Sequence, residues 1–499
     1  MRLIFLLLFI ISSQHAQTLY KTLSSNPARL NPLLATDSAS GTITSYIFNG
    51  LVKYDKDAKI IGDLAQSFDF KTPKKVIFKL RKSVTWHDGA PFTAEDVKFT
   101  YDLLKSDKLS TPYSNTFRMV SSVKVVDKYT LEVNYKTPYY KALEIWMMGI
   151  VPKHILEKET QYMTSSFNQH PIGTGPYTLK SLELSKHIIL KGNPNYFEHP
   201  PFMDQIVFSI VPDPTTNFYM LLKKEIDLNG LTPLQLEKKV SKDFRTNYQI
   251  IEQITKGYTY LGFNHQREIF KDPKVRKAIS LGINKQEIVD ILFFKHGQAC
   301  YGPFLPGTFA YNTAYEKQGF NKDKARSLLK EAGFDKEHPL TFEITTNSGN
   351  SIRLAAAQII QHQLSKIGIQ VKLRVLEWQA FLSMVVHPKK FDAIILGWGL
   401  SIVPDAYSIW HSDGIKQGGF NLVSYQNDTV DQMILDAEQI VDKKLLASQY
   451  QEIFARIVED NPYVFLYIAN DITAVNQHIS PIIPSIIGIE HNQIEWIKQ

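Results

Sequence analysis

Short helix-like and strand-like segments alternate along this chain, and no flexible linker separates them. Residues 352–367 carry apolar side chains at helical spacing, Gly368 follows as a stop, and residues 369–375 alternate apolar and polar. This pattern predicts an amphipathic helix that leads into a strand, which is one unit of an open sheet. We therefore expect a mixed α/β fold whose parts are joined by short crossings rather than by a tether.

Capping residues predict where other helices begin and end. Thr93 and Asp96 have the spacing of a capping box, so a helix should start at about residue 94. Asn321 should cap another helix, and Gly333 should end it. The same reasoning predicts helices after Asp272-Pro273 and after Asn284, and strands at 76–80 and 130–135.

The first residues predict export. Arg2 precedes nine consecutive apolar residues at 3–11, which suits a secretory signal but falls short of the about 20 residues that span a membrane. We predict a signal peptide at 1–16; an uncleaved anchor is the alternative. Cys300 is the only cysteine, so an internal disulfide, a Cys-rich metal site and a lipid-modified N-terminus are excluded. We expect an unlipidated protein of a Gram-negative periplasm.

Charge and motifs exclude several functions. The net charge is +7 over 499 residues, and no Lys/Arg run forms a nucleic-acid footprint. The sequence has no H-E-x-x-H, P-loop or G-x-S-x-G motif, so we expect neither a catalytic residue nor a cofactor nor a metal. The G-x-G sequence at 173–177 is an incomplete phosphate-binding motif, and we interpret it as a tight turn. The His87-Asp88 pair could suggest acid/base chemistry, but we interpret it as a strand end that runs into a turn. A secreted hydrolase is the remote alternative.

Seven stretches of the sequence, taken together, carry a resemblance to a known family. They are 30–33 with 47–52, 78–97, 172–177, 260–264 with 272–278, 324–333, 363–378 and 396–398. These stretches resemble the family-5 extracellular solute-binding proteins of ABC transporters, which include dipeptide-, oligopeptide- and nickel-binding proteins. The matches run in family order from about residue 19 to 475.

The resemblance implies a periplasmic-binding-protein-like fold of two lobes joined by a two-crossing hinge. Lobe I would comprise residues 17–43, 172–260 and 475–499, lobe II residues 261–474, and an extra subdomain residues 44–171. A ligand would bind between the lobes, which close around it, and the closed monomer would dock on an inner-membrane ABC permease. We expect the ligand to be a di- or oligopeptide or a similar extended polar solute. A nickel chelate, haem or an oligosaccharide is the alternative within the family.

The resemblance also places the segment that begins Gly-Trp at 397–398 in the cleft. In peptide-binding members, an Asp in Gly-Trp-x-x-Asp receives the α-ammonium of the ligand. The matching residue here is Ser401, which supplies no counter-charge, so we expect Asp405 either to replace it or to act as a turn residue. Trp398 offers an apolar face to a ligand or belongs to the core, and Gly399 and Tyr407 are further candidates.

The opposite wall of the cleft is matched by the small polar segment 36–41. Asp37, Ser38 and Ser40 lie in it, and its exposed backbone groups could pair with an extended ligand; a surface loop is the alternative. Tyr258 lies near the expected first crossing, where its ring would either stack on the ligand or pack in the core.

Overall fold

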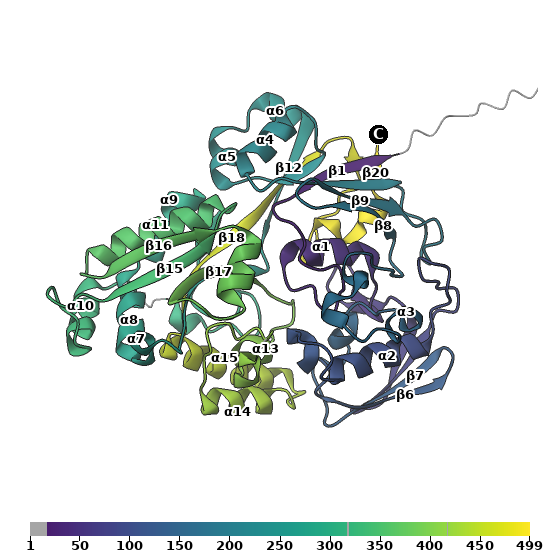
Figure 1. The fold of residues 1–499 in the computed structure, drawn as a ribbon, viewed down its shortest axis with the longest axis horizontal. Coiled ribbons are helices and arrows are strands. Elements are labelled where there is room, and N and C mark those ends of the chain that lie inside the picture. The colour runs from purple at the N-terminus through teal and green to yellow at the C-terminus, as the bar shows by residue number, and fades with distance from the viewer. Residues whose placement is uncertain (1–16, 317–318, 417) are drawn as a thin grey trace, which may run out of the picture.

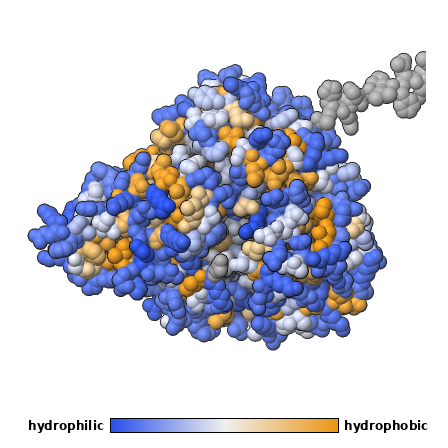
Figure 2. Space-filling model, viewed as in Figure 1, coloured by the Kyte–Doolittle hydropathy of each residue, from blue (hydrophilic) through white to orange (hydrophobic). Residues whose placement is uncertain are grey.

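The structure is a computed structural model that describes residues 17–316, 319–416 and 418–499. The predicted signal peptide at 1–16 lies outside the described residues. Within the described ranges, no helix is both long enough and apolar enough to cross a membrane. On the face drawn in Figure 2, hydrophilic residues cover most of the surface and apolar residues form separate patches.

A 12-stranded sheet runs through the whole molecule (Figure 1). Two of its strands, β12 (Tyr248–Ile254) and β14 (Gly297–Ala299), pair with β18 beside the main path. The main path is β16 (Gln370–Leu376), β15 (Thr341–Asn347), β17 (Ala393–Gly399), β13 (Gly257–Phe263), β18 (Tyr463–Asn476), β11 (Leu228–Gly230), β1 (Thr18–Leu23), β10 (Gln205–Ile210), β9 (His187–Gly192) and β8 (Tyr177–Glu183).

The long strand β18 links the two halves of this sheet. Its first part, up to Ala469, pairs with β13 and β14, and from Asn470 it pairs with β12. The chain passes between the same two halves a second time at residues 255–256, between β12 and β13. The fold therefore has two lobes joined by two crossings, as predicted. The changes of pairing lie a few residues before the lobe boundaries expected from the sequence, and those boundaries stay a prediction.

Fifteen α-helices are described in the three ranges. Their bounds are α1 (Ser38–Ile47), α2 (Ala94–Lys105), α3 (Lys153–Leu156), α4 (Pro214–Leu222), α5 (Pro233–Lys238), α6 (Lys242–Asn247), α7 (Glu268–Lys271), α8 (Pro273–Gly282), α9 (Lys285–Phe293), α10 (Lys322–Glu331), α11 (Ser351–Ser365), α12 (Trp378–Phe381), α13 (Tyr407–Trp410), α14 (Asp428–Ala437) and α15 (Lys443–Asp460).

The predicted helix-to-strand unit is present in lobe II. Helix α11 connects the parallel strands β15 and β16, and Gly368 adopts a positive φ of 88° in the turn between α11 and β16. The helix ends two residues earlier than predicted. Both faces of this part of the sheet are buried: Ile395 packs with residues of α8–α11, whereas Ile394 packs with residues of α13–α15. Strand side chains alternate between faces, so one apolar run fills two cores.

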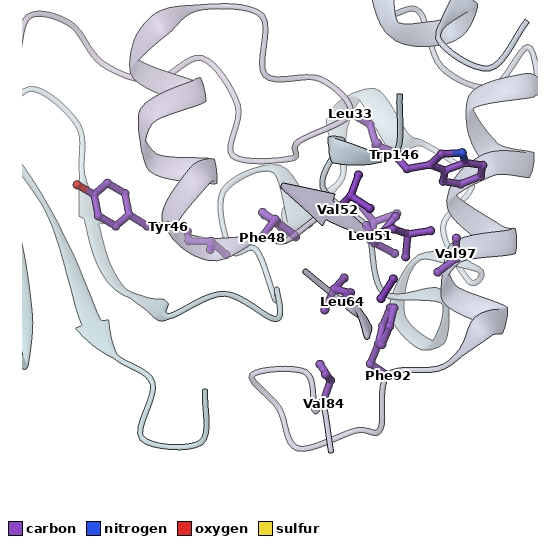
Figure 3. Packing of buried hydrophobic residues seen from close by; sticks show 14 of the residues in the cluster. Leu33, Tyr46, Phe48, Leu51, Val52, Leu64, Val84, Phe92, Val97 and Trp146 are labelled. Carbon is purple, nitrogen blue, oxygen red and sulfur yellow. The ribbon is translucent and has the colours of Figure 1, made fainter. Parts of the chain in front are cut away.

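The region between α1 and β8 contains a separate four-stranded sheet in the order β4 (Ala65–Thr72), β5 (Lys75–Leu80), β7 (Thr130–Tyr135) and β6 (Val120–Asp127). The same region contains a two-stranded antiparallel pair, β2 (Val52–Tyr54) with β3 (Ile60–Gly62). A second such pair, β19 (Ile479–Ser480) with β20 (Ile497–Lys498), lies near the C-terminus. Figure 3 shows Phe48, Leu51 and Trp146 in one buried cluster, which continues into β1 and β10. This region therefore shares one hydrophobic core with β1 and β10.

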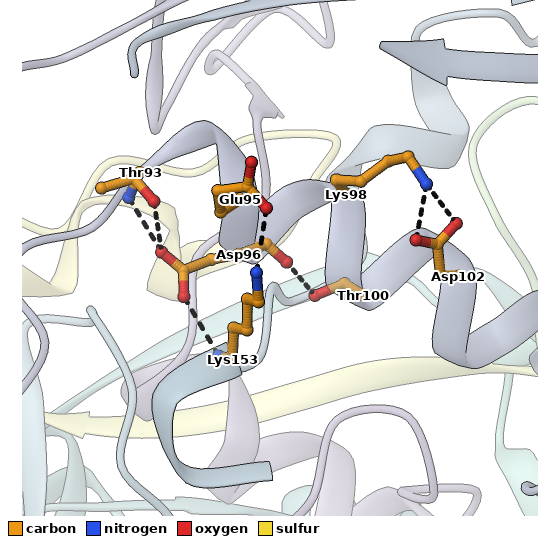
Figure 4. A network of polar contacts seen from close by, with 7 residues as sticks. All are labelled: Thr93, Glu95, Asp96, Lys98, Thr100, Asp102 and Lys153. Carbon is orange, nitrogen blue, oxygen red and sulfur yellow. Dashed lines mark hydrogen bonds and ion pairs between the residues drawn. The ribbon is translucent and has the colours of Figure 1, made fainter. Parts of the chain in front are cut away.

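The capping box predicted at residue 94 is formed (Figure 4). The Asp96 carboxylate accepts hydrogen bonds from the Thr93 backbone N–H at 2.8 Å and from the Lys153 backbone N–H at 3.0 Å. Thr100 Oγ1 donates to the Asp96 carbonyl at 2.9 Å, one turn further along α2. The box therefore starts α2 and also joins it to the start of α3.

A polar cluster spans the hinge. His296, which immediately precedes β14, has Nδ1 at 2.8 Å from Glu252 Oε1 and Nε2 at 2.9 Å from Glu237 Oε1. Asn470 Nδ2 donates to the same Glu252 oxygen at 2.5 Å. Burial lowers the pKa of His296, but hydrogen bonds to the two carboxylates outweigh it, so the net pKa is raised. When protonated, the ring donates to both carboxylates and so links helix α5 and strand β12 on one side of the crossings to the turn after α9 on the other.

Candidate ligand-binding cleft

The main cavity lies between the lobes, beside the two crossings, and its volume of 870 Å³ is in the range of pockets that hold a ligand. Its walls come from the start of α1, from the crossing segment 255–259, and from the end of β17 with the loop that follows. Two smaller cavities of 540 and 520 Å³ share lining residues with it. Together they form an extended cleft.

Aromatic side chains hold Trp398 in place on the lobe II wall. Its ring stacks on Tyr260 with centroids 6.0 Å apart, and it meets the edge of Phe420 at 5.4 Å. Trp398 Nε1 donates to Tyr463 Oη at 3.3 Å. The side chain is half-buried and lines the main cavity, so it belongs to the core on one side and borders the cleft on the other.

Gly399 and Tyr258 also line the main cavity, as expected from the sequence. A Cβ on Gly399 would meet no atom within 4 Å, so this exposed residue leaves free space at the end of β17. Tyr258 is only 4% exposed, and its ring packs edge-on against Phe465 at 5.4 Å. No described residue hydrogen-bonds to its Oη. Burial raises the pKa of Tyr258 well above the ordinary value, so the phenol stays neutral.

On the opposite wall, the segment 36–41 leads into helix α1. Asp37 caps helix α1, which begins at Ser38, and its carboxylate accepts from Ser40 N at 3.0 Å and from Ser40 Oγ at 2.6 Å. Asp37 and the exposed Ser38 line the main cavity. Ser40 does not, because it is fully buried and accepts hydrogen bonds from the backbone of Ala28 and Arg29. The expectation that Ser40 contacts the ligand is therefore wrong: its hydroxyl is used inside the protein.

Ser401 and Asp405 both line the cleft. Ser401 is exposed, and its Oγ donates to the Val403 carbonyl at 2.5 Å. Asp405 already has partners: Oδ2 accepts from Lys141 Nζ at 2.7 Å, and Oδ1 accepts from Tyr407 N at 2.9 Å. Burial raises the pKa of Asp405, but the Lys141 charge outweighs it and the net pKa is lowered. Asp405 is thus an ionised carboxylate whose counter-charge is internal.

Tyr407 lines the 540 Å³ cavity rather than the main one. Its Oη donates to Asp413 at 2.6 Å, and the Arg118 guanidinium lies 3.4 Å above its ring centroid. Arg118 also forms an ion pair with Glu438. The Tyr407 hydroxyl is therefore occupied, and the face of its ring is covered by a cation.

Sequence reasoning missed the basic residues of the cleft. Arg118 and Lys141 come from the region between α1 and β8 and meet acidic partners about 260 to 320 residues later in the chain. Lys256 and Arg353 line the main cavity itself. None of the four belongs to a motif. Only Lys256 lies near a feature expected from the sequence, because it is close to the expected first crossing.

Two motifs considered for chemistry have structural roles. A Cβ on Gly173 would lie 1.8 Å from the Ile47 carbonyl oxygen, so the glycine is required where the chain packs against the end of α1. His87 Nδ1 accepts from Gly173 N at 3.2 Å, whereas Asp88 Oδ2 lies 2.7 Å from His154 Nε2. The adjacent His87 and Asp88 thus have different partners, as the structural interpretation predicts. Among the described residues, no group of three or more His, Cys, Asp or Glu is placed to hold a metal ion.

Comparison with known proteins agrees with this geometry. The oligopeptide-binding protein AppA of Bacillus subtilis is 32% identical over 472 residues, which cover 91% of this chain and 86% of AppA. The structure of B. subtilis AppA in complex with a nonapeptide superposes with a TM-score of 0.91 at 30% identity, covering 97% of this chain and 99% of AppA. NikZ of Campylobacter jejuni in complex with Ni(L-His) superposes with a TM-score of 0.87 at 26% identity, covering 97% of this chain and 100% of NikZ.

The model of one protein family matches residues 59–420 of the chain, which is most of its length. That family is described as bacterial extracellular solute-binding proteins, family 5. The chain therefore belongs to the family-5 extracellular solute-binding proteins.

Proposed function

We propose that this protein is the periplasmic binding component of an ABC importer, which captures a peptide between its lobes and delivers it to an inner-membrane permease. The observation that carries the proposal is the 870 Å³ cavity beside the crossings, whose walls come from both lobes. A ligand that touches both walls stabilises the closed form over the open form, and this difference drives closure. The likeness to AppA solved with a nonapeptide supports a peptide as the ligand.

The cleft offers the contacts that an extended peptide needs. The half-buried Trp398 presents an apolar ring, and the exposed Gly399 leaves free space beside it at the end of β17. Backbone pairing binds a peptide largely independently of its side chains, and the two adjoining cavities give those side chains room. These features favour a carrier that accepts several peptide sequences.

The proposal also covers export of the protein, the division of the chain into lobes and the fate of the ligand. Residues 1–16 direct export to the periplasm without lipidation, and the mature chain acts as a monomer. Residues 17–43, 172–260 and 475–499 form lobe I, residues 261–474 form lobe II, and residues 44–171 move with lobe I as an extra subdomain. The shared core between that region and β1 supports this grouping. The ligand leaves chemically unchanged.

A thermal-shift screen of the mature protein against peptides of two to nine residues tests the proposal. A ligand at 100 times its dissociation constant should raise the free energy of unfolding by about 2.7 kcal/mol. Mass spectrometry of the same samples should recover the peptide intact, and small-angle scattering should show a more compact particle with ligand. Cleaved peptide would favour the secreted hydrolase. Stabilisation by nickel-histidine, haem or an oligosaccharide, with no response to any peptide, would favour the other carriers.

A further inference from the structure

The polar cluster at the hinge lies on the face of the sheet away from the cleft. On β12, Gln253 donates to the Ser485 carbonyl at 2.9 Å, in the C-terminal segment whose Ile487 lines the 540 Å³ cavity. The neighbouring Glu252 points to the opposite face, because side chains on a strand alternate. The members of this hinge cluster, none of which lines the three cavities of the cleft, are Glu237, Glu252, His296 and Asn470.

The hinge cluster joins the two halves of the large sheet where they meet. The His296 carbonyl accepts from the Asn470 backbone N–H at 2.9 Å, at the residue where β18 changes its partner from β14 to β12. The Asn470 side chain also donates to Glu252. The backbone of His296 is therefore fixed beside β14 and Glu252 beside the pivot, whereas Glu237 lies away from the pivot on helix α5.

The contact between His296 and Glu237 depends on the angle between the lobes. In this structure the two sides of the cleft touch, because Lys141 pairs with Asp405 at 2.7 Å. Rotation about the two crossings opens the cleft on one face of the sheet and moves α5 relative to the end of α9 on the other. A hydrogen bond of 2.9 Å tolerates little such movement. The closed angle therefore lets His296 contact both carboxylates, and opening misaligns the contact with Glu237.

Only a protonated ring satisfies both carboxylates. A neutral imidazole donates from one nitrogen and presents a lone pair at the other, whereas the protonated ring donates from both. His296 Nδ1 and Nε2 lie 2.8 and 2.9 Å from one carboxylate each. Burial raises the pKa of Glu252, but hydrogen bonds from Asn470 and His296 outweigh it, so the net pKa is lowered and this carboxylate is ionised at neutral pH. Loss of the proton therefore leaves a lone pair facing a carboxylate.

The charged groups next to the cluster do not replace this link. On α5, the end of α9 and β18 they are Lys238, Lys239, Asp290, Lys295 and Asp471. The first four are exposed to solvent. Asp471 points to the opposite face of β18 from Asn470, where its charge acts on Lys256. The charge of the hinge cluster therefore changes with the protonation of His296.

We infer that the hinge cluster is a pH-sensitive link between the lobes: protonated His296 stabilises the closed arrangement, and loss of its proton favours the open one. The link forms when the ring binds Glu237 and Glu252 together, so its contribution is present at low pH and is lost as pH rises. A solute that needs both lobes binds only the closed form, so its affinity should fall over the same pH range. The inference goes beyond the proposed function, because it holds whichever solute the cleft binds.

The test is fluorescence energy transfer in the full mature chain without ligand, measured between about pH 5.5 and 8.5. Donor and acceptor dyes are attached to Lys108→Cys, after α2, and to Lys444→Cys, at the start of α15. Both positions are exposed and lie on opposite sides of the cleft (Figure 1). Cys300 is buried and remains unlabelled. A hydrogen bond between charged groups predicts that the ratio of closed to open protein falls about tenfold over this range.

Three variants of the labelled chain assign the response to residues. His296→Gln keeps a hydrogen-bonding side chain that does not titrate, so its ratio of closed to open protein should change by less than about twofold. Glu237→Gln removes one of the two carboxylates and should reduce the response to about threefold. His338→Gln is the matched control, because this side chain is 80% exposed and lies near Asp335 rather than at the hinge; it should keep the full response. Each variant is compared with itself across pH, so a loss of folding stability does not imitate the result.

The outcomes decide the inference without a ligand. A ratio that is constant in the wild type, or that rises with pH, refutes the link. A fall that persists undiminished in His296→Gln also refutes it, because other groups would then control closure. A fall that disappears in His296→Gln and remains in His338→Gln supports it. A negative peptide screen would overturn the proposed function and leave each of these results standing.

Discussion

The ion pair between Lys141 and Asp405 should hold the cleft closed. Lys141 belongs to the region between α1 and β8, whereas Asp405 follows β17 on the other side of the cleft. Their Nζ and Oδ2 atoms are 2.7 Å apart, and the side chains are 11% and 26% exposed. Opening the lobes would separate and hydrate both charges. Asp405→Asn therefore leaves Lys141 buried without a counter-charge only in the closed form.

The magnitude follows from the burial of the pair. Removing one partner of a fully buried ion pair costs about 3–5 kcal/mol. Asp405 is partly exposed and Asn can still accept a hydrogen bond, so about 2 kcal/mol is expected here. This lowers the ratio of closed to open protein roughly 30-fold. If the ligand is held only by the closed form, Kd rises by about the same factor.

Calorimetry with one peptide, carrying a free or an acetylated N-terminus, checks the reasoning. Asp405→Asn should weaken both forms equally, and Lys141→Met should weaken both as well, because it leaves the Asp405 carboxylate unpaired. The double variant Lys141→Met/Asp405→Leu should recover much of the affinity. A loss confined to the free N-terminus, or tighter binding in Lys141→Met, would refute the reasoning and establish Asp405 as the ligand anchor anticipated from the sequence.

Three further predictions concern stability and reactivity. The folded-state pKa of His296 is raised, so its stabilising contribution is complete below the ordinary value of about 6.5 and is lost as pH rises through the raised pKa. Thermal melts between pH 5.5 and 9 should show this step in the wild type, and the same step in His296→Gln would contradict it. Gly173→Ala places a Cβ 1.8 Å from the Ile47 carbonyl and should lower the free energy of unfolding by roughly 3 kcal/mol in urea titrations. Its control, Gly399→Ala, meets no atom within 4 Å and should change that free energy by less than about 0.5 kcal/mol; equal effects would refute the steric argument. Burial raises the pKa of Cys300 to about 11, so iodoacetamide at pH 8 should alkylate it only after unfolding, and rapid native labelling would contradict this.

Local structure could be predicted from the sequence wherever a short-range interaction decides it. The Thr93–Asp96 box and the Asn321 cap with Gly333 involve residues within one or a few helical turns, and the structure forms them. The alternation at 369–375 identified a strand because side chains on a strand alternate between faces. The resemblance extended this to the whole fold, and the two crossings at β18 and between β12 and β13 are present.

The sequence predicted where the cleft lies, but it predicted only some of the side chains that line it. Trp398, Tyr258 and Asp37 line the main cavity as expected, whereas Ser40 is turned inward by the start of helix α1. Whether a side chain of a short polar segment faces the cleft or the protein interior depends on which backbone groups lie nearby. Here the N–H groups of Ala28 and Arg29 donate to the Ser40 hydroxyl.

Charge at the site was decided by tertiary structure alone. The spacing around Asp405 shows a carboxylate after a turn, but only folding brings Lys141 from 264 residues away to neutralise it. The same process places Lys256 and Arg353 beside the cavity, where each donates a hydrogen bond to a neutral partner. The sequence by itself determined the family and those helices and strands that depend on local pattern. Electrostatic balance depends on distances between residues remote in the chain, so only the folded structure determines which charges of the cleft are already paired.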